Sequence, residues 1–191
     1  MMDNYVRLYS DIAPKEWCDA QIEKFEEDKE NHETQDCGED ATLTQINMMH
    51  GPNTMWRESI NVLINYLMMG VEQYKKDCGL TDKQWPTSIG FEPPKLKRYM
   101  PGRNEKFPEH VDVLNKATCN RFLVAFLYLN TVELGGQTII RPSTPEVTDS
   151  FISTPKQGNL LLFPPMWPWL HTGDAPITGP KYIIGGYLTY A

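Results

Sequence analysis

The hydrophobic pattern of this chain changes its period near residue 85, and this change divides the fold into two kinds of structure. Before it, apolar residues recur every three or four positions and predict a long helix over residues 53 to 78, capped by Asn53 and ended by Gly79. A shorter apolar stripe after Pro14 predicts a first helix over residues 14 to 30. The stripe of the long helix consists of Trp56, Ile60, Leu63, Leu67, Val71 and Tyr74.

After residue 85, short β-prone runs alternate with turn residues such as Pro-Gly at 101, Gly-Gly at 135, Gln-Gly-Asn at 157 and Gly-Pro at 179. Many short strands separated by turns are typical of a sandwich or barrel. We therefore expect one domain over residues 1–191, with mainly helical support in 1–84 and a β-barrel in 85–191. The expected strands are residues 88–100, 110–114, 120–130, 137–141, 147–152, 159–163 and 181–190.

The charge of the chain limits its partners. A net charge of −7 argues against nucleic acid, because binding to phosphates relies on clustered Lys and Arg. Much of the acid lies in residues 24 to 40, which look like a solvated loop with an exposed His32. The oligomeric state is not indicated by the sequence.

Other features of the sequence bear on location. The longest apolar runs, residues 62–71 and 122–129, are about half as long as a membrane crossing requires, so we expect no membrane partner. The first residues lack a secretory signal, which favours the cytoplasm. Four widely spaced cysteines indicate free thiols in a reducing compartment.

A candidate metal site begins at His110-Val111-Asp112 in the segment FPEHVDV. Residues two apart in a strand point to the same face, so His110 and Asp112 would project into one space. Two histidines and a carboxylate on one octahedral face are the ligands of non-haem Fe(II) oxygenases. His171 follows the strand-like NLLLFPP and is the best third ligand, whereas His50 is expected in a loop. The residues alone also fit a hydrogen-bonded His110–Asp112 pair and a core histidine at 171.

The order of these residues resembles that of the 2-oxoglutarate- and Fe(II)-dependent dioxygenases, most closely the prolyl 4-hydroxylase catalytic domain. The resemblance covers about residues 88 to 190 and rests on H-x-D, FLYLN and GGQT, the distal histidine, and Lys181 ten residues after it. It implies an α+β fold with a double-stranded β-helix (jelly-roll, cupin-like) core backed by N-terminal helices. It also implies Fe(II) held by His110, Asp112 and His171, with 2-oxoglutarate and O2 as co-substrates and ascorbate as reductant.

The same resemblance assigns residues to 2-oxoglutarate. Lys181 would pair with the distal carboxylate, and a buried ammonium needs such an anion. Many relatives outside the prolyl 4-hydroxylases use arginine there, so lysine favours this branch. The other expected contacts are Thr138, Tyr128, Tyr99 and Tyr187. On the residues alone, Lys181 also fits a surface lysine at a strand start, and Thr138 and the tyrosines fit ordinary strand packing.

The resemblance also points to substrate residues. Relatives carry an arginine at the position of Arg121 that faces a peptide substrate, and Glu92 is a weaker match of the same kind. Trp167 is a candidate for an apolar mouth, whereas Trp169 is expected in packing. The chain departs from the family in a slightly longer spacing between Tyr99 and His110 and in a shorter stretch between residues 136 and 171.

Together these features predict hydroxylation of a prolyl residue in a peptide or protein, with release of succinate and CO2. Two alternatives remain at this point, a hydroxylase of a free amino acid or small metabolite and a non-catalytic β-barrel binding module. Repair of alkylated nucleobases is disfavoured, because those enzymes carry arginines after the distal histidine and no arginine follows Arg141 here.

Overall fold

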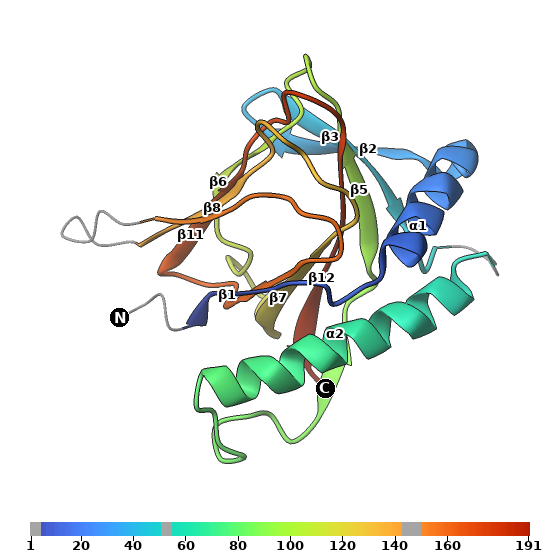
Figure 1. Ribbon diagram of the computed structural model, residues 1–191. Helices are drawn as coiled ribbons and strands as arrows, with labels where there is room; N and C mark the ends of the chain where they lie inside the picture. Colours follow the sequence, from blue (N-terminus) through green and yellow to red (C-terminus); the bar gives the residue numbers. More distant parts are fainter. Residues whose placement is uncertain (1–4, 51–54, 143–149) are drawn as a thin grey trace.

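Two antiparallel sheets face each other and form a double-stranded β-helix (Figure 1). The computed structural model describes residues 5–50, 55–142 and 150–191. The strands of the larger sheet are β1 (Arg7–Tyr9), β2 (Glu33–Gly38), β3 (Ala41–Asn47), β4 (Ile89–Phe91), β5 (Lys95–Tyr99), β7 (Arg121–Tyr128), β10 (Leu160–Phe163) and β12 (Lys181–Tyr190). Those of the smaller sheet are β6 (Phe107–His110), β8 (Thr138–Pro142), β9 (Phe151–Ser153) and β11 (Trp169–Gly173).

The order of strands brings the middle of the chain beside its end. The larger sheet runs β1-β10-β7-β12-β5-β3-β2, with β4 paired to β12, and the smaller runs β6-β11-β8-β9. β12 therefore lies between β5 and β7, and β11 lies between β6 and β8. Residues distant in sequence meet where the two sheets face each other, and this is where a site can form.

Two helices cover the outer face of the larger sheet, as Figure 1 shows for α2 below the strands and α1 beside them. Both predicted helices are confirmed, as α1 (Lys15–Glu27) and α2 (Arg57–Asp77). Gly79 ends α2 as predicted, with a φ of +63° and an N–H that donates to the Lys76 carbonyl. The predicted cap Asn53 lies outside the described residues. Neither described helix combines the length and the hydropathy needed to cross a membrane.

The alternation of residues along β7 separates two cores. Leu123, Ala125 and Leu127 pack with the apolar stripe of α2 in the core under the helices. Val124 and Tyr128, one residue out of phase, belong to the core between the sheets. Side chains on the inward faces of both sheets therefore form the second core, and some of these side chains are polar.

The prediction of a solvated loop over residues 24 to 40 is wrong. This segment includes the end of α1, the short 3-10 helix η2 (Lys29–Asn31) and β2, which pairs with β3. β2 is polar on both faces and is ordered by backbone hydrogen bonds to β3, so it has no hydrophobic period that a sequence pattern reveals. His32 is half-buried and stacks on Phe25, with ring centroids 4.3 Å apart.

Several expected strands have different limits. The expected strand 88–100 is divided into β4 and β5 by a segment containing Pro93 and Pro94, which cannot donate to a ladder. The expected strand 110–114 is wrong, because β6 covers Phe107–His110 and residues 111–114 follow it outside any strand. Of the expected strand 147–152, residues 147–149 lie outside the described residues, and the rest overlaps β9. β1, β3 and β11 were not predicted.

The predicted turn at Gly158 fastens the N-terminal segment to the larger sheet. The Gly158 carbonyl accepts hydrogen bonds from the N–H groups of Ile12 and Ala13, and its own N–H donates to the Tyr128 carbonyl. Its φ is +80°, in the left-handed region, and an added Cβ would collide with the Ala13 carbonyl oxygen. We therefore expect Gly158→Ala to lower the free energy of unfolding by about 2–4 kcal/mol.

Gly38→Ala is the matched control for this variant. Gly38 has the same φ of +80°, but nothing lies within 4 Å of its added Cβ. Only the backbone strain remains, so the expected loss is about 1–2 kcal/mol. Urea denaturation of both variants measures the difference, and equal losses would show that the contact with Ala13 relaxes without cost.

Candidate functional site

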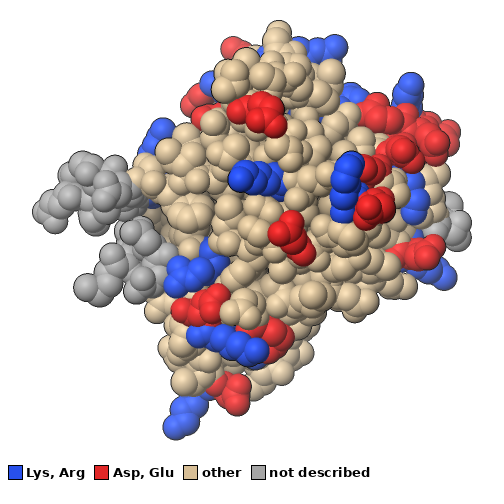
Figure 2. Space-filling model, viewed as in Figure 1, with Lys and Arg blue, Asp and Glu red and all other residues tan. Residues whose placement is uncertain are grey.

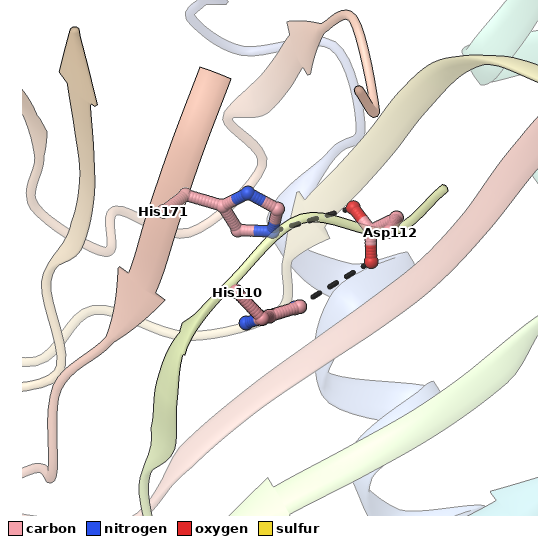
Figure 3. Close-up of side chains that lie close together, drawn as sticks. All are labelled: His110, Asp112 and His171. Atoms are coloured by element: carbon pink, nitrogen blue, oxygen red, sulfur yellow. Dashed lines mark ion pairs between the residues drawn. The ribbon is translucent and has the colours of Figure 1, made fainter. Parts of the chain in front are cut away.

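Three side chains from two distant segments of the chain meet between the sheets (Figure 3). His110 and His171 are direct cross-strand partners in the β6–β11 pair. Oδ1 of Asp112 lies 3.5 Å from Nε2 of His110, and Oδ2 lies 3.3 Å from Nε2 of His171. One ligand atom from each residue lies within 4.8 Å of the others, close enough to share one ion. The structure thus brings the predicted triad together.

Asp112 reaches this position for a reason other than the predicted one. It lies beyond the end of β6, so the rule that residues two apart share a strand face does not apply. Instead its N–H donates to the carbonyl of Pro165, and its carbonyl accepts from Nη1 of Arg121 at 3.0 Å. The hydroxyl of Tyr187 donates to Oδ1 at 2.6 Å. Contacts from several segments therefore aim the carboxylate.

The polar atoms of the triad fit a bound cation. Nδ1 of His110 lies 2.8 Å from the Pro108 carbonyl, and Nδ1 of His171 lies 3.0 Å from the Trp169 carbonyl. An Nδ1–H that donates to a carbonyl leaves a lone pair on Nε2, directed at the carboxylate. Nε2 of His171 and Oδ2 of Asp112 are buried without a hydrogen-bond partner among the described residues. A cation between two buried acceptors that face each other would satisfy both of them.

The protonation of Asp112 agrees with this arrangement. Burial alone would raise the pKa of its carboxyl group. The nearby imidazoles of His110 and His171 and a hydrogen bond from the Tyr187 hydroxyl outweigh burial and hold that pKa well below its usual range. The group is therefore ionised, and a divalent metal would meet two imidazoles and one carboxylate, which suit Fe(II).

Lys181 provides a buried positive charge at the start of β12. Its side chain is 1% exposed, and its Nζ lies 5.2 Å and 5.9 Å from the ring centroids of Tyr99 and Tyr128. No described residue accepts a hydrogen bond from Nζ. Burial lowers the pKa of Lys181 to about 7, although Asp174 opposes the shift. This ammonium is suited to an anionic ligand.

Hydroxyl groups gather near Lys181. The hydroxyl of Tyr128 lies 2.9 Å from the hydroxyl oxygens of both Thr138 and Ser153, which are cross-strand partners in β8 and β9. Burial raises the pKa of Tyr128 to about 12, so the phenol is neutral. Ser153 was missed by the sequence analysis, because one serine in a strand carries no signal until its partner is known.

Two adjoining cavities meet at the triad. The inner cavity reaches Lys181 and is lined by Tyr99, Thr138 and His171. The outer cavity has a volume of about 250 Å³ and is lined by Gln35 and Glu92, among others. Residues that line both cavities are Lys97, Phe107, His110, Asp112, Phe126 and Tyr187. A metal at the triad would therefore be accessible from both cavities.

Arg121 and Glu92 lie together in the outer cavity. Nε and Nη2 of Arg121 donate to the two carboxylate oxygens of Glu92 at 2.7 Å and 2.9 Å. The guanidinium carbon lies 3.8 Å from the ring centroid of Tyr187, which in turn holds Asp112. Both predicted substrate residues thus line the outer cavity, and Arg121 also orients the Asp112 segment through the Asp112 carbonyl.

The two tryptophans differ in position. Trp169 packs in the core between the sheets, as predicted, with its ring edge-on to Tyr5. Trp167 is 75% exposed and does not line either cavity. The structure therefore does not bring Trp167 to the triad. It does bring Lys97, which the sequence analysis missed because a lysine on a strand resembles a surface residue.

Comparisons with known proteins agree with this geometry. The model of a family described as the 2OG-Fe(II) oxygenase superfamily matches residues 94–189. No curated protein matches this sequence.

Three solved structures show the same fold. The viral collagen prolyl hydroxylase of Paramecium bursaria Chlorella virus-1, in complex with 2OG, is 18% identical, with a TM-score of 0.66 over 98% of this chain and 96% of that one. A prolyl hydroxylase of Trichoplax adhaerens, in complex with a hypoxia inducible factor peptide, is 17% identical. Its TM-score is 0.72, and the match covers 98% of this chain and 84% of that one. A prolyl-4-hydroxylase of Pseudomonas putida is 13% identical. Its TM-score is 0.63, and the match covers 97% of this chain and 92% of that one. At these identities the likeness concerns the fold alone.

Proposed function

This chain belongs to the 2OG-Fe(II) oxygenase superfamily, and from that premise we propose that it hydroxylates a prolyl residue of a peptide or protein. The observation that carries the catalytic part is a triad of two imidazoles and one carboxylate, bordered by two cavities, of which the inner one contains a buried ammonium. The prolyl part is supported by the prolyl hydroxylases that share the fold, one of them with a peptide bound.

The triad and the inner cavity would bind the metal and the co-substrate. His110, Asp112 and His171 would hold Fe(II), and Lys181 would bind the distal carboxylate of 2-oxoglutarate. A bound Fe(II) would supply O2 activation with electrons from 2-oxoglutarate, so that 2-oxoglutarate would leave as succinate and CO2 and one oxygen atom would enter a substrate C–H bond. The side chains of Tyr99 and Thr138 line the inner cavity, the Tyr128 hydroxyl donates to that of Thr138, and together they would keep water from the Lys181 ion pair.

The outer cavity would receive the substrate. Tyr187 orients Asp112 with its hydroxyl, and its ring supports Arg121. Arg121 and Glu92 neutralise each other at the side of the cavity, so they hold its shape without net charge. Phe107 and Phe126 supply the apolar surface that a pyrrolidine ring would contact. We further propose that the helices and the barrel act as one domain, since a continuous core joins them.

Incubation with Fe(II), 2-oxoglutarate, ascorbate and a library of proline-containing peptides tests this function. We expect one oxygen atom to be added to a proline, with one succinate formed for each hydroxylation, and turnover to decline without ascorbate. Tandem mass spectrometry locates the oxygen. Succinate formed with a free amino acid or metabolite, and with no peptide, would move the activity to a small-molecule substrate. Stoichiometric iron binding without any turnover would indicate that the protein is a non-catalytic binding module.

Binding of 2-oxoglutarate should weaken as the pH rises. The ammonium of Lys181 has a pKa of about 7 in the free protein, so it is charged below pH 7 and is progressively neutral above it. Only the charged form pairs with a carboxylate, so we expect the dissociation constant to rise by up to about tenfold per pH unit above pH 7. Anaerobic calorimetry with Mn(II)-loaded protein measures this constant.

Lys181→Arg is the control for the pH dependence. A guanidinium stays charged over the whole range, so the variant should bind 2-oxoglutarate with a nearly constant affinity between pH 7 and pH 9. Equal slopes for the variant and the natural protein would assign the pH dependence to the metal ligands and not to Lys181.

A further inference from the structure

A second buried lysine, Lys97, lies beside the triad and has no role in the proposed reaction. It is on the inward face of β5, between Lys95 and Tyr99, and its cross-strand partners are Gln45 and Ile183. The residue is 9% exposed and borders both cavities. Its ammonium is therefore at the junction through which a substrate in the outer cavity would approach the metal.

No described carboxylate is available to Lys97. None lies within the 4.0 Å of an ion pair from Nζ, and no described residue accepts a hydrogen bond from it. The two acids in the outer cavity have other partners, since Asp112 is held by the triad and Tyr187, and Glu92 is paired with Arg121. Burial lowers the pKa of Lys97 to about 8, although the charge of Asp112, which is not within ion-pair distance, opposes the shift. An ammonium in this position is incomplete without an anionic ligand.

The nearest aromatic contact places that ligand close to the reacting centre. Nζ of Lys97 lies 5.3 Å from the ring centroid of Phe107. The Phe107 ring stacks on His110, with centroids 4.1 Å apart and planes 27° apart. Lys97 and the triad residue His110 therefore lie next to the same ring. An anion bound there would be carried by a part of the substrate adjacent to the atom that reacts.

The co-substrate does not account for this second charge. Its distal carboxylate would pair with Lys181 in the inner cavity, and its other end would chelate the metal. Lys97 and Lys181 are near enough that the charge of Lys97 lowers the pKa of Lys181. A second anion in the outer cavity would relieve this repulsion.

The polarity of the outer cavity also favours an anion. Lys95 projects from the same face of β5, lines the same cavity, and has no described ion-pair partner. Once the Glu92–Arg121 pair and the triad are set aside, the remaining charges of the cavity are these two lysines. The chain as a whole has a net charge of −7, and acidic side chains gather over α1 and β2 in Figure 2. The basic cavity is a local exception to an acidic surface.

We propose that the outer cavity recognises a carboxylate of the substrate next to the carbon that is hydroxylated, and that Lys97 binds this carboxylate. The inference rests on the proposed function for the reaction but concerns only the choice of substrate. The carboxylate can belong to an acidic residue beside the target proline in a peptide, or to the α-carboxylate of a chain terminus or a free amino acid. Both sources present the same group to Lys97.

The test compares substrates that differ only in this group. Three peptides carry Glu, Gln or Lys next to the proline, and a prolyl compound is supplied with a free α-carboxylate and as its amide. The ratio kcat/KM is measured for each, together with the dissociation constant for Mn(II)- and 2-oxoglutarate-loaded protein without O2. We expect Glu to be preferred over Gln by about tenfold to a hundredfold, as for a buried hydrogen bond to a charged group. Preference for the free α-carboxylate alone would identify the second source.

Substitutions of Lys97 test whether this residue causes the preference for the Glu peptide over the Gln peptide. Lys97→Met removes the charge at similar volume and should reduce the ratio between the Glu and Gln substrates to about one, whereas Lys97→Arg should keep most of it. Lys76→Met, an exposed lysine on α2, is the matched control and should leave the ratio unchanged. Thermal denaturation of each variant confirms that it is folded.

The outcomes separate this inference from the proposed function. Equal kcat/KM for the Glu and Gln peptides, with prolines hydroxylated in both, would overturn the inference and leave the function. A higher KM for 2-oxoglutarate in Lys97→Met, with the substrate preference unchanged, would assign Lys97 to the co-substrate and also overturn it. Carboxylate-bearing compounds that bind through Lys97 while no proline is hydroxylated would support the inference and refute the function.

Discussion

Asp112→Asn is expected to abolish metal binding and turnover while the fold remains intact. In the natural protein, the Asp112 carboxylate faces two Nε2 atoms that carry lone pairs, so a cation is attracted to the three acceptors. An asparagine oxygen can still accept from Tyr187, and its NH2 group can donate to Nε2 of His171. The variant thus replaces the metal by a hydrogen bond, and we expect its affinity for Mn(II) or Co(II) to fall well over 100-fold.

The stability of the same variant provides an independent readout. The buried polar atoms of residues 112 and 171 then have partners, so the free energy of unfolding without metal should stay within about 1 kcal/mol of that of the natural protein. Glu109→Gln is the matched control, because Glu109 is an exposed acid next to His110 whose ion-pair partner among the described residues is Arg141. Metal titration and succinate formation are measured for both. Tight metal binding by the Asn variant would refute the assignment of Asp112 as a ligand.

Lys181→Met is expected to have two large effects of opposite sign. Loss of the ammonium removes the partner of the distal carboxylate, so the affinity for 2-oxoglutarate should fall at least about 100-fold, the scale of a broken buried ion pair. Without co-substrate, the natural protein contains a buried ammonium with no described acceptor, which is unfavourable. The methionine variant should therefore be more stable by about 1–4 kcal/mol.

The sign of the stability change depends on pH in a defined way. Since the folded pKa of Lys181 is lowered to about 7, the unfolded chain binds more protons between pH 7 and the ordinary lysine value. The destabilisation by Lys181 is then complete below about pH 7 and disappears as the pH rises toward the ordinary lysine value, so the advantage of the variant should shrink in that direction. Guanidinium denaturation at several pH values measures it. A variant less stable than the natural protein at pH 7 would show that the ammonium is already satisfied.

Much of the architecture was predictable because it follows from the period of apolar residues. The stripe of α2 and the alternation in β7 each bury one face, and such patterns are local to the segment that carries them. The polar edge strand β2 has no such pattern and was wrongly expected to be a loop, because pairing with β3 and not burial orders it. β11 was also missed, although it carries His171.

The same division applies to the candidate site. His110, Asp112, His171 and Lys181 were identified from spacing and family resemblance, and the structure brings the first three into one cluster. Ser153 and Lys97 were not identified, because a serine or a lysine in a strand has no distinguishing neighbours in the sequence. Their place became evident only from the register of β8 with β9 and of β5 with β12.

By itself, the sequence determined the two helices and the strands with the clearest hydrophobic period, such as β7 and β12, and which residue types are present for a metal and a dicarboxylate. Tertiary structure alone decided that the carboxylate of Asp112, beyond its strand, is aimed by Pro165, Arg121 and Tyr187. It also decided that the ammonium of Lys97 is enclosed beside the triad. The physical reason is that periodicity is a property of neighbours along the chain, whereas desolvation and the direction of a charge depend on atoms brought close from elsewhere.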